Sequence, residues 1–311
     1  MGEGARGPAP GAWSSYSETE RVETGPTPPP VPADPPRRGM AIVANDRIAD
    51  WLLPFLESWK RTNSTVPLYL IPYDDNVALT RRAADIYGVH FVTDDIRALD
   101  RLAAELYPLS GKRQRLRKLH ALALPLDEVI YIDVDIVLFR DMTPLFGRLR
   151  KGDVDFIVAS PSFDYVYNDR KDDHPFLKNA LLFSDGFWLT SNKILNLDTV
   201  MRTFARDKKL FHSVRLKLKG LYAQPVVNFV CHRNGLNIRI ITEVLPTASH
   251  ETFYTATGVT FKDGAPLDQE GRDIYFSHWA GGDTSLPLDS HGPFDAAWRD
   301  FAAAARARLG S

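Results

Sequence analysis

Short apolar runs alternate with helical patterns between residues 39 and 135. The apolar runs are MAIVAND, VPLYLIPYDD, VHFVTDD and VIYIDVD, and the helical segments between them are ADWLLPFLESWKRT, TRRAADIYG and RQRLRKLHALAL. Strands that are separated by helices pair in parallel, because a parallel pair needs a long crossover connection. The alternation therefore predicts an α/β fold with a doubly wound, mostly parallel central sheet flanked by helices.

The second half of the chain has a more mixed pattern. Strands are expected at DFIVASP, GFWLTSN, NIRIITEVLP and DIYFSHW, and helices at SNKILNLDTVMRTFARD, QPVVNFVCHRNG and PFDAAWRDFAAAARARLG. A short helix is expected to open at Thr143-Pro144, with the proline at its first position. Gly88 and Gly235 are expected to end helices in the left-handed conformation that glycine tolerates.

Proline marks the beginning of the chain. Residues 1–38 contain nine prolines, which remove N–H donors and fix φ, so this segment is expected to be a disordered Pro-rich extension. No shift in composition divides residues 39–311, which are therefore expected to form one domain.

Composition excludes several classes of partner. The net charge is −1, so no overall field attracts nucleic acid or an anionic membrane. No run of eighteen apolar residues predicts a membrane span. Cys231 is the single cysteine, and the N-terminus lacks the apolar stretch of a secretory signal, so we expect a cytoplasmic protein. The oligomeric state is left open.

Two carboxylates interrupt the most apolar run, 129-VIYIDVDIVLF-139. Asp133 and Asp135 come at the predicted end of a buried strand, which is the edge where ligands bind in open parallel sheets. Residues two apart in an extended backbone point to the same side, so the two carboxylates repel each other unless a cation lies between them. A divalent metal site is the simplest interpretation.

A phosphatase is an alternative at this point. Haloacid-dehalogenase-like phosphatases also use an apolar strand followed by Asp-x-Asp, with the first acid as nucleophile, and 133-DVDIV-137 fits that pattern. Such enzymes usually carry the motif on their first strand, whereas about ninety residues of folded chain precede it here. Asp172-Asp173, a second pair of acids, lies in a polar loop and is interpreted as solvated.

Four segments together resemble the GT-A glycosyltransferases, most closely family 8. They are KLHALALPLDEVIYIDVDIVLFRDMTPLF, SDGFWLTSN, QPVVNFVCHRNG and FSHWAGG, and they occur in the family's order. The resemblance implies a GT-A fold and transfer of a sugar, with retained configuration, from a nucleoside diphosphate sugar such as a UDP-sugar to a small-molecule or glycan acceptor. It also implies Mn²⁺ or Mg²⁺, held by Asp133, Asp135 and His278.

The resemblance also assigns residues around the donor. Gln224, Asp185 and Lys118 take the catalytic positions, with Gln224 near the anomeric carbon. The donor would also contact residues at five further positions, which are Asn45, Arg115, Asp133, Gly186 and Gly281. In the basic run 112-KRQRLRK-118, Arg115 and Lys118 are expected on one helix face.

The pattern departs from the family in three places. Ala223 replaces the acid before the glutamine, Ser184 or Asp185 before Gly186 matches the family's asparagine only loosely, and no lysine follows the His-x-x-Gly element in HWAGGDTSLPL. A protein that binds a nucleotide sugar without turning it over is therefore a further alternative. Tyr165, Tyr167 and Trp188 are candidates for stacking on an acceptor, although aromatic side chains more often belong to the core.

Overall fold

Seven strands form the central sheet in the part of the chain that the structure, a computed structural model, describes (residues 36–162, 166–217, 223–280 and 292–310). Their order is β3-β2-β1-β4-β7-β6-β8. All neighbours pair in parallel except β7, which is antiparallel to both β4 and β6. This arrangement confirms the expected α/β fold with a mostly parallel central sheet.

The strands of the central sheet are β1 (Arg38–Ala44), β2 (Leu68–Pro72), β3 (His90–Phe91), β4 (Glu128–Ile132), β6 (Phe156–Val158), β7 (Phe187–Ser191) and β8 (Ile238–Ile240). The α-helices are α1 (Ala49–Thr62), α2 (Ala78–Tyr87), α3 (Arg97–Leu106), α4 (Leu197–Val214), α5 (Ala223–Arg233), α6 (Ile241–Val244) and α7 (Asp295–Leu309). A 3₁₀ helix, η2, covers Arg113–Ala123.

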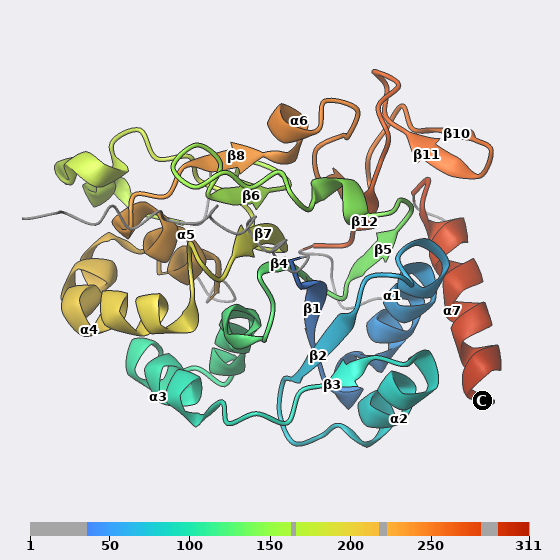
Figure 1. Cartoon of the computed structure of the whole chain (residues 1–311), viewed down its shortest axis with the longest axis horizontal. Coiled ribbons are helices and arrows are strands. Elements are labelled where there is room, and N and C mark those ends of the chain that lie inside the picture. Colours follow the sequence, from blue (N-terminus) through green and yellow to red (C-terminus); the bar gives the residue numbers. More distant parts are fainter. Residues whose placement is uncertain (1–35, 163–165, 218–222, 281–291, 311) are drawn as a thin grey trace, which may run out of the picture. The chain divides into compact units, whose positions relative to one another are not determined.

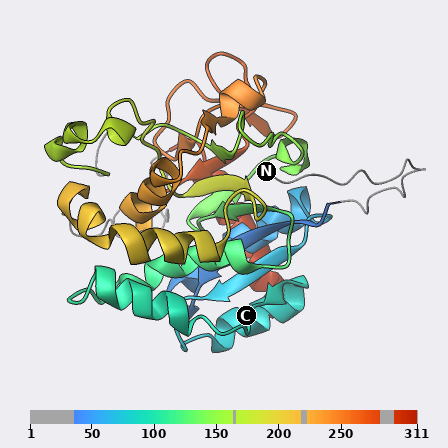
Figure 2. The same ribbon diagram turned by 60° about the vertical axis from the view of Figure 1, so that its left-hand side comes forward.

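Helices cover both faces of the central sheet. Because successive side chains of a strand point to opposite sides, each strand contributes to the apolar cluster on either face. Met40, Ile42 and Ala44 of β1 pack in one apolar cluster with α1 and α2, whereas Ala41 and Val43 pack in another with α3, η2, α4 and α5. Figure 1 shows α1, α2 and α7 on one side of β1 and β2 and α3, α4 and α5 on the other. In Figure 2, α3 and the gold helix α4 lie in front of the sheet.

The apolar run 129–139 does not form the single strand that its composition indicates. It divides into β4 and β5 (Ile136–Leu138), which belong to different sheets. In the second sheet, β5 pairs antiparallel with β12 (Phe276–His278), which pairs in parallel with β9 (Thr252–Phe253). The backbone N–H of Leu138 donates to the buried Ser58 hydroxyl of α1 (3.0 Å), so β5 is anchored directly on that helix.

A separate two-stranded hairpin consists of β10 (Thr260–Lys262) and β11 (Ala265–Leu267).

The structure also corrects several local expectations from the sequence. RQRLRKLHALAL forms the tighter η2 rather than an α-helix, and the short helix at Thr143–Leu145 is a single 3₁₀ turn. The strand expected over NIRIITEVLP is only three residues long and runs into α6. Helix α3 was not expected.

Helix ends agree well with the glycine signals. Gly88 caps α2 with φ = 71°, and Gly235 follows α5 with φ = 64°.

None of the helices in the described part of the chain combines the length and the apolar character that a membrane crossing needs.

Glu57 connects the three helices on one face of the sheet. Its carboxylate in α1 is almost fully buried and accepts hydrogen bonds from Tyr87 of α2 (2.8 Å), Arg308 of α7 (3.1 Å) and Arg61 (3.0 Å). Burial by itself would raise the pKa of Glu57, but these three donors outweigh it and hold the pKa below its ordinary value. The folded state therefore stabilises the ionised carboxylate.

Glu57→Gln should lower the free energy of unfolding by about 2 kcal/mol at pH 7, because the three donors lose the negative charge and one of the two oxygens that accept from them. Since the folded-state pKa is depressed, this contribution is present above pH 4.5 and disappears as the pH falls through the folded-state value. Urea unfolding at several pH values measures it. Glu105→Gln, at an exposed ion pair with Lys208, should change little, and an effect of Glu57→Gln that is independent of pH would contradict the assignment.

Candidate metal centre and active site

Asp133 and Asp135 lie where the chain leaves the central sheet. Asp133 follows β4 directly, and its N–H donates to the carbonyl of Gly186 (2.8 Å), which extends the pairing of β4 with β7 by one residue. Asp135 directly precedes β5, and its carbonyl accepts the N–H of Trp279 (2.9 Å). Backbone hydrogen bonds to two sheets therefore fix both acids. Their side chains remain 29% and 36% exposed, so a ligand can reach them.

His278 reaches the same point from the other end of the chain. It ends β12, and the antiparallel register pairs it with Ile136, the neighbour of Asp135. Its Nε2 lies 3.1 Å from Asp135 Oδ1. One ligand atom from each of Asp133, Asp135 and His278 lies within 4.8 Å of the others, the one such group of three among the described residues. The structure thus brings together the three residues that the sequence resemblance proposes as metal ligands.

Lys118 and Tyr131 hold the first of these acids. The buried Lys118 ammonium lies 3.3 Å from Asp133 Oδ1, and it also contacts the Asp185 carboxylate (2.8 Å) and the Asp185 carbonyl (3.2 Å). The Tyr131 hydroxyl donates to Asp133 Oδ1 (2.5 Å). Tyr131 precedes Asp133 by two residues, so the alternation of side chains along β4 puts both on one face.

Negative charge exceeds positive charge in this group. Four carboxylates (Asp133, Asp135, Asp185 and Glu251) face one ammonium and one imidazole, so two negative charges remain even when the imidazole is protonated. Burial raises the pKa of Asp133 above its ordinary value, and the two neighbouring aspartates add to this while Lys118 opposes it. Burial favours a neutral His278, but the Asp135 and Glu251 carboxylates outweigh it and raise the pKa of His278 well above its ordinary value.

The donor set fits a divalent cation. Two carboxylates and an imidazole suit Mn²⁺ and also accommodate Mg²⁺, and a cation relieves the surplus of negative charge. Gly186 makes room for this arrangement. A Cβ there would lie 2.6 Å from His278 Cε1 and 3.4 Å from Asp133 Oδ2, so any other side chain would push the imidazole away.

Glu251 belongs to this site although nothing in the sequence pattern singled it out. Its carboxylate is completely buried, directly before β9, and it is hydrogen-bonded to Nδ1 of His278, the ring nitrogen opposite Asp135. A lone glutamate in a polar segment has no spacing signal that would identify it. Tyr131, by contrast, could have been found from its i, i+2 relation to Asp133.

The other predicted site residues lie around this centre or outside the described residues. Asn45 follows β1, is buried and donates to Asp74 (2.9 Å). Arg115 is exposed on η2, whereas Lys118 is buried, and Arg115 lies close enough to Tyr73 to influence its pKa. Gln224 is the second residue of α5 and donates to the Ser162 hydroxyl (3.1 Å). Gly281 lies outside the residues that the structure describes.

Aromatic side chains near the site divide into buried and exposed ones. Tyr167 and Trp188 are buried in the core, and Tyr165 lies outside the described residues. Phe253, which was not expected, is 42% exposed. Its ring stacks on that of His278, with centroids 6.1 Å apart and planes inclined by 18°.

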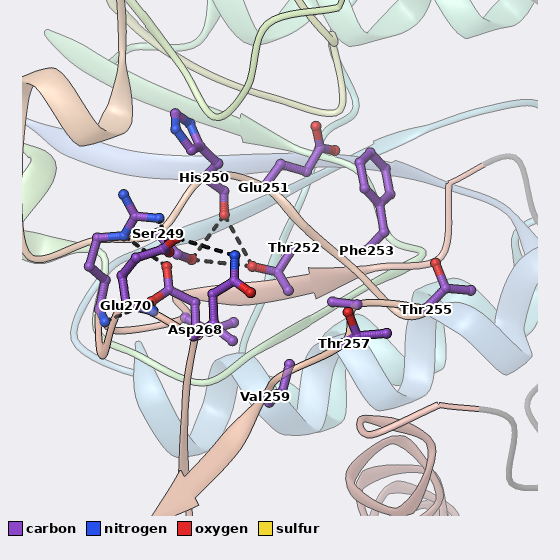
Figure 3. A pocket seen from close by; sticks show the side chains of 14 residues that line it. Ser249, His250, Glu251, Thr252, Phe253, Thr255, Thr257, Val259, Asp268 and Glu270 are labelled. Carbon is purple, nitrogen blue, oxygen red and sulfur yellow. Dashed lines mark hydrogen bonds and ion pairs between the residues drawn. The ribbon is translucent and has the colours of Figure 1, made fainter.

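A cavity of about 340 Å³ adjoins this part of the molecule. Its lining comes from residues 249–259 around β9 and from residues 268–274. In Figure 3, Glu251 and Phe253 point to one side of the backbone and Thr252 to the other. The cavity does not include the metal-ligand candidates, and its Asp268 and Glu270 carboxylates are paired with Arg272.

Comparison with known proteins gives matches only among solved structures. No protein-family model matches the chain, and no curated protein matches it. An active-site mutant of LgtC matches with a TM-score of 0.56 and 13% identity, over 86% of this chain and 95% of the other. The galactosyltransferase LgtC in complex with donor and acceptor sugar analogues matches over the same shares, with a TM-score of 0.53 and 14% identity.

The bifunctional glycosyltransferase WbbM also matches, with a TM-score of 0.56 and 13% identity. The match covers 90% of this chain but only 53% of WbbM, so the chain spans about half the length of that protein. At such low identity the likeness concerns the backbone. The chain therefore has the GT-A fold of these glycosyltransferases.

Proposed function

We propose that this protein is a metal-dependent glycosyltransferase. It transfers a sugar from a nucleoside diphosphate sugar, with a UDP-sugar as the first candidate, to a sugar-containing acceptor and retains the anomeric configuration. The observation that carries the proposal is the convergence of Asp133, Asp135 and His278 at the end of β4, within a GT-A fold.

Departure of a nucleoside diphosphate leaves negative charge on the diphosphate. A divalent cation held by Asp133, Asp135 and His278 would neutralise that charge as a Lewis acid. The two aspartates can hold the cation because backbone hydrogen bonds from two sheets fix their positions. Their partial exposure leaves the centre open to the diphosphate.

Lys118 is better suited to orient acids than to contact the donor. An ammonium has three donors, and Lys118 has three acceptors within 3.3 Å, namely Asp133 Oδ1, Asp185 Oδ2 and the Asp185 carbonyl. We therefore place Lys118 behind the two acids and keep Asp185 as the polar group that meets the sugar.

Gln224 remains the candidate for the reacting face of the sugar. It lies in the first turn of α5, where unpaired N–H groups and the helix dipole favour negative charge. Its amide donates to Ser162, two residues after the Ser160 that contacts Glu251. Asn45, directly after β1, and Arg115, near the beginning of η2, are proposed to contact the nucleotide.

Phe253 supports an acceptor with a sugar ring. Its exposed ring lies directly beside His278, and an aromatic face matches the apolar C–H face of a pyranose. Tyr167 and Trp188, which are buried, cannot serve in this way.

The remaining alternatives have no support in the fold comparison. In the phosphatase hypothesis Asp133 is a nucleophile, yet its Oδ1 already accepts from Tyr131 and faces Lys118. A binding protein without turnover is distinguished from a transferase only by measurement.

Asp135→Ala should abolish Mn²⁺-dependent binding of a nucleoside diphosphate and lower turnover by about 100-fold or more, because the leaving charge loses its counter-charge. Calorimetry with UDP and Mn²⁺, and release of UDP from UDP-sugars, measure the two effects. Asp172→Ala, at an exposed acid of the polar loop, is the control. Wild-type turnover in the Asp135 variant would exclude the metal assignment.

Transferase and phosphatase differ in their products. The protein should release a nucleoside diphosphate from a nucleotide sugar, slowly by hydrolysis and faster with an acceptor, and should not cleave an aryl phosphate in the presence of Mg²⁺. Aryl phosphatase activity that Asp133→Asn removes would reverse the proposal. Binding of nucleotide sugar with no release of diphosphate under any condition would favour the non-catalytic alternative.

Phe253→Ala should raise the KM for the acceptor by about fivefold, since an exposed aromatic contact of this kind contributes about 1 kcal/mol, while the KM for the donor stays near the wild-type value. Phe261→Ala, at the similarly exposed Phe261 of β10, is the matched control. Equal effects of both substitutions on acceptor KM would remove Phe253 from the acceptor site.

A further inference from the structure

Glu251 is a completely buried carboxylate with an unusual set of neighbours. Besides His278, it accepts hydrogen bonds from the hydroxyls of Ser160 (2.5 Å) and Ser184 (3.4 Å). Among the described residues, Glu251 forms an ion pair with His278 and with no Arg or Lys side chain. Because a buried carboxylate is costly unless it is well paired, its location calls for an explanation.

The imidazole of His278 has different partners on its two nitrogens. Nδ1 faces Glu251, and Nε2 faces Asp135 at 3.1 Å. Both partners are carboxylates, which can only accept, so without a cation each ring nitrogen has an acceptor for a proton. A cation between Asp135 and Nε2 would displace the proton from Nε2, whereas Glu251 would hold the proton on Nδ1. The lone pair of the neutral ring would then lie on Nε2 and point toward the cation. A ligating histidine in metal sites usually donates its other ring N–H in this way.

Glu251 also joins the segments that surround the ring. Ser160 follows β6 by two residues, Ser184 precedes Gly186 by two, and His278 ends β12. The Glu251 N–H donates to the Ala159 carbonyl (3.3 Å), and this hydrogen bond holds the backbone of Glu251 next to the end of β6. Gly186 on the other side leaves no room for a Cβ next to His278 Cε1. The ring is therefore held between Gly186 and the hydrogen bond to Glu251.

We propose that Glu251 is a positioning residue of the metal centre. It fixes the rotation and the tautomer of His278, so that Nε2 is presented to a cation shared with Asp133 and Asp135. The inference rests on the proposed function, because it requires that His278 is a metal ligand.

The test compares Mn²⁺ affinities of the purified full-length protein, measured by electron paramagnetic resonance of free Mn²⁺ without any sugar substrate. Glu251→Gln should raise the Kd for Mn²⁺ by about 10-fold to 100-fold, as other substitutions behind metal-ligating histidines do. Glu57→Gln is the matched control, because it also removes a buried carboxylate with three hydrogen bonds but lies in the α1–α2–α7 contact. It should leave the Kd unchanged.

A double-mutant cycle distinguishes action through His278 from a general loss of order. In a His278→Asn background, Glu251→Gln should cause no further loss of Mn²⁺ affinity, because the ring that it positions is gone. The same loss in both backgrounds would overturn the inference. If His278→Asn weakens Mn²⁺ binding but Glu251→Gln does not, the inference fails while the metal proposal stands, and if the wild type binds no Mn²⁺, both fail.

A spectroscopic measurement on the wild-type protein needs no folded Glu251 variant. Nitrogen-15 spectra of histidine-labelled protein with saturating Mg²⁺ should show His278 protonated on Nδ1, with the signal identified by its loss in His278→Asn. Protonation on Nε2 instead would overturn the inference.

Discussion

Repulsion among carboxylates at the end of β4 is the constraint around which the site is built. The carboxylates of Asp133, Asp135 and Asp185 lie close to one another. The Glu251 carboxylate lies on the other side of the His278 ring. Charges brought this close in a partly buried site raise the energy of the fold unless donors surround them. The observed donors are Lys118, Tyr131, His278 and the hydroxyls of Ser160 and Ser184, and they leave two negative charges uncompensated. A cation held by Asp133, Asp135 and His278, as proposed above, would compensate this charge.

The change of sheet between the two aspartates creates this centre. If residues 129–139 formed one strand of the central sheet, β5 would not be available to pair with β12. His278 would then not be placed next to Asp135. Instead β5 turns away onto α1, where Ser58 accepts the hydrogen bond of its Leu138 N–H. Strand β12 then pairs with β5 and carries His278 to the level of Ile136. The catalytic proposal therefore depends on a junction between two sheets.

Local patterns predicted the elements whose neighbours lie close in sequence. The apolar spacing in ADWLLPFLESWKRT predicted α1, and Gly88 marked the end of α2, since both signals depend on backbone conformation within one or two turns. The sequence patterns gave wrong element types or bounds where contacts with distant segments determine the local structure. η2, which contains Lys118, carries a helical pattern but forms 3₁₀ turns, and the apolar run through Asp133 and Asp135 divides because each half pairs with a different sheet.

The sequence by itself determined the alternation of strands and helices, the position of the two aspartates after an apolar strand, and the order of motifs that resemble a glycosyltransferase. Those features follow from composition and spacing along the chain. Only the tertiary structure decided that Glu251 lies behind His278, that Phe253 is the exposed aromatic ring beside it, and that Lys118 is enclosed by acids. These contacts join residues 15 to 67 positions apart, between segments that the sheets bring together. Pairing across sheets leaves no periodic signal in the chain, so such contacts become visible only when the strands are in register.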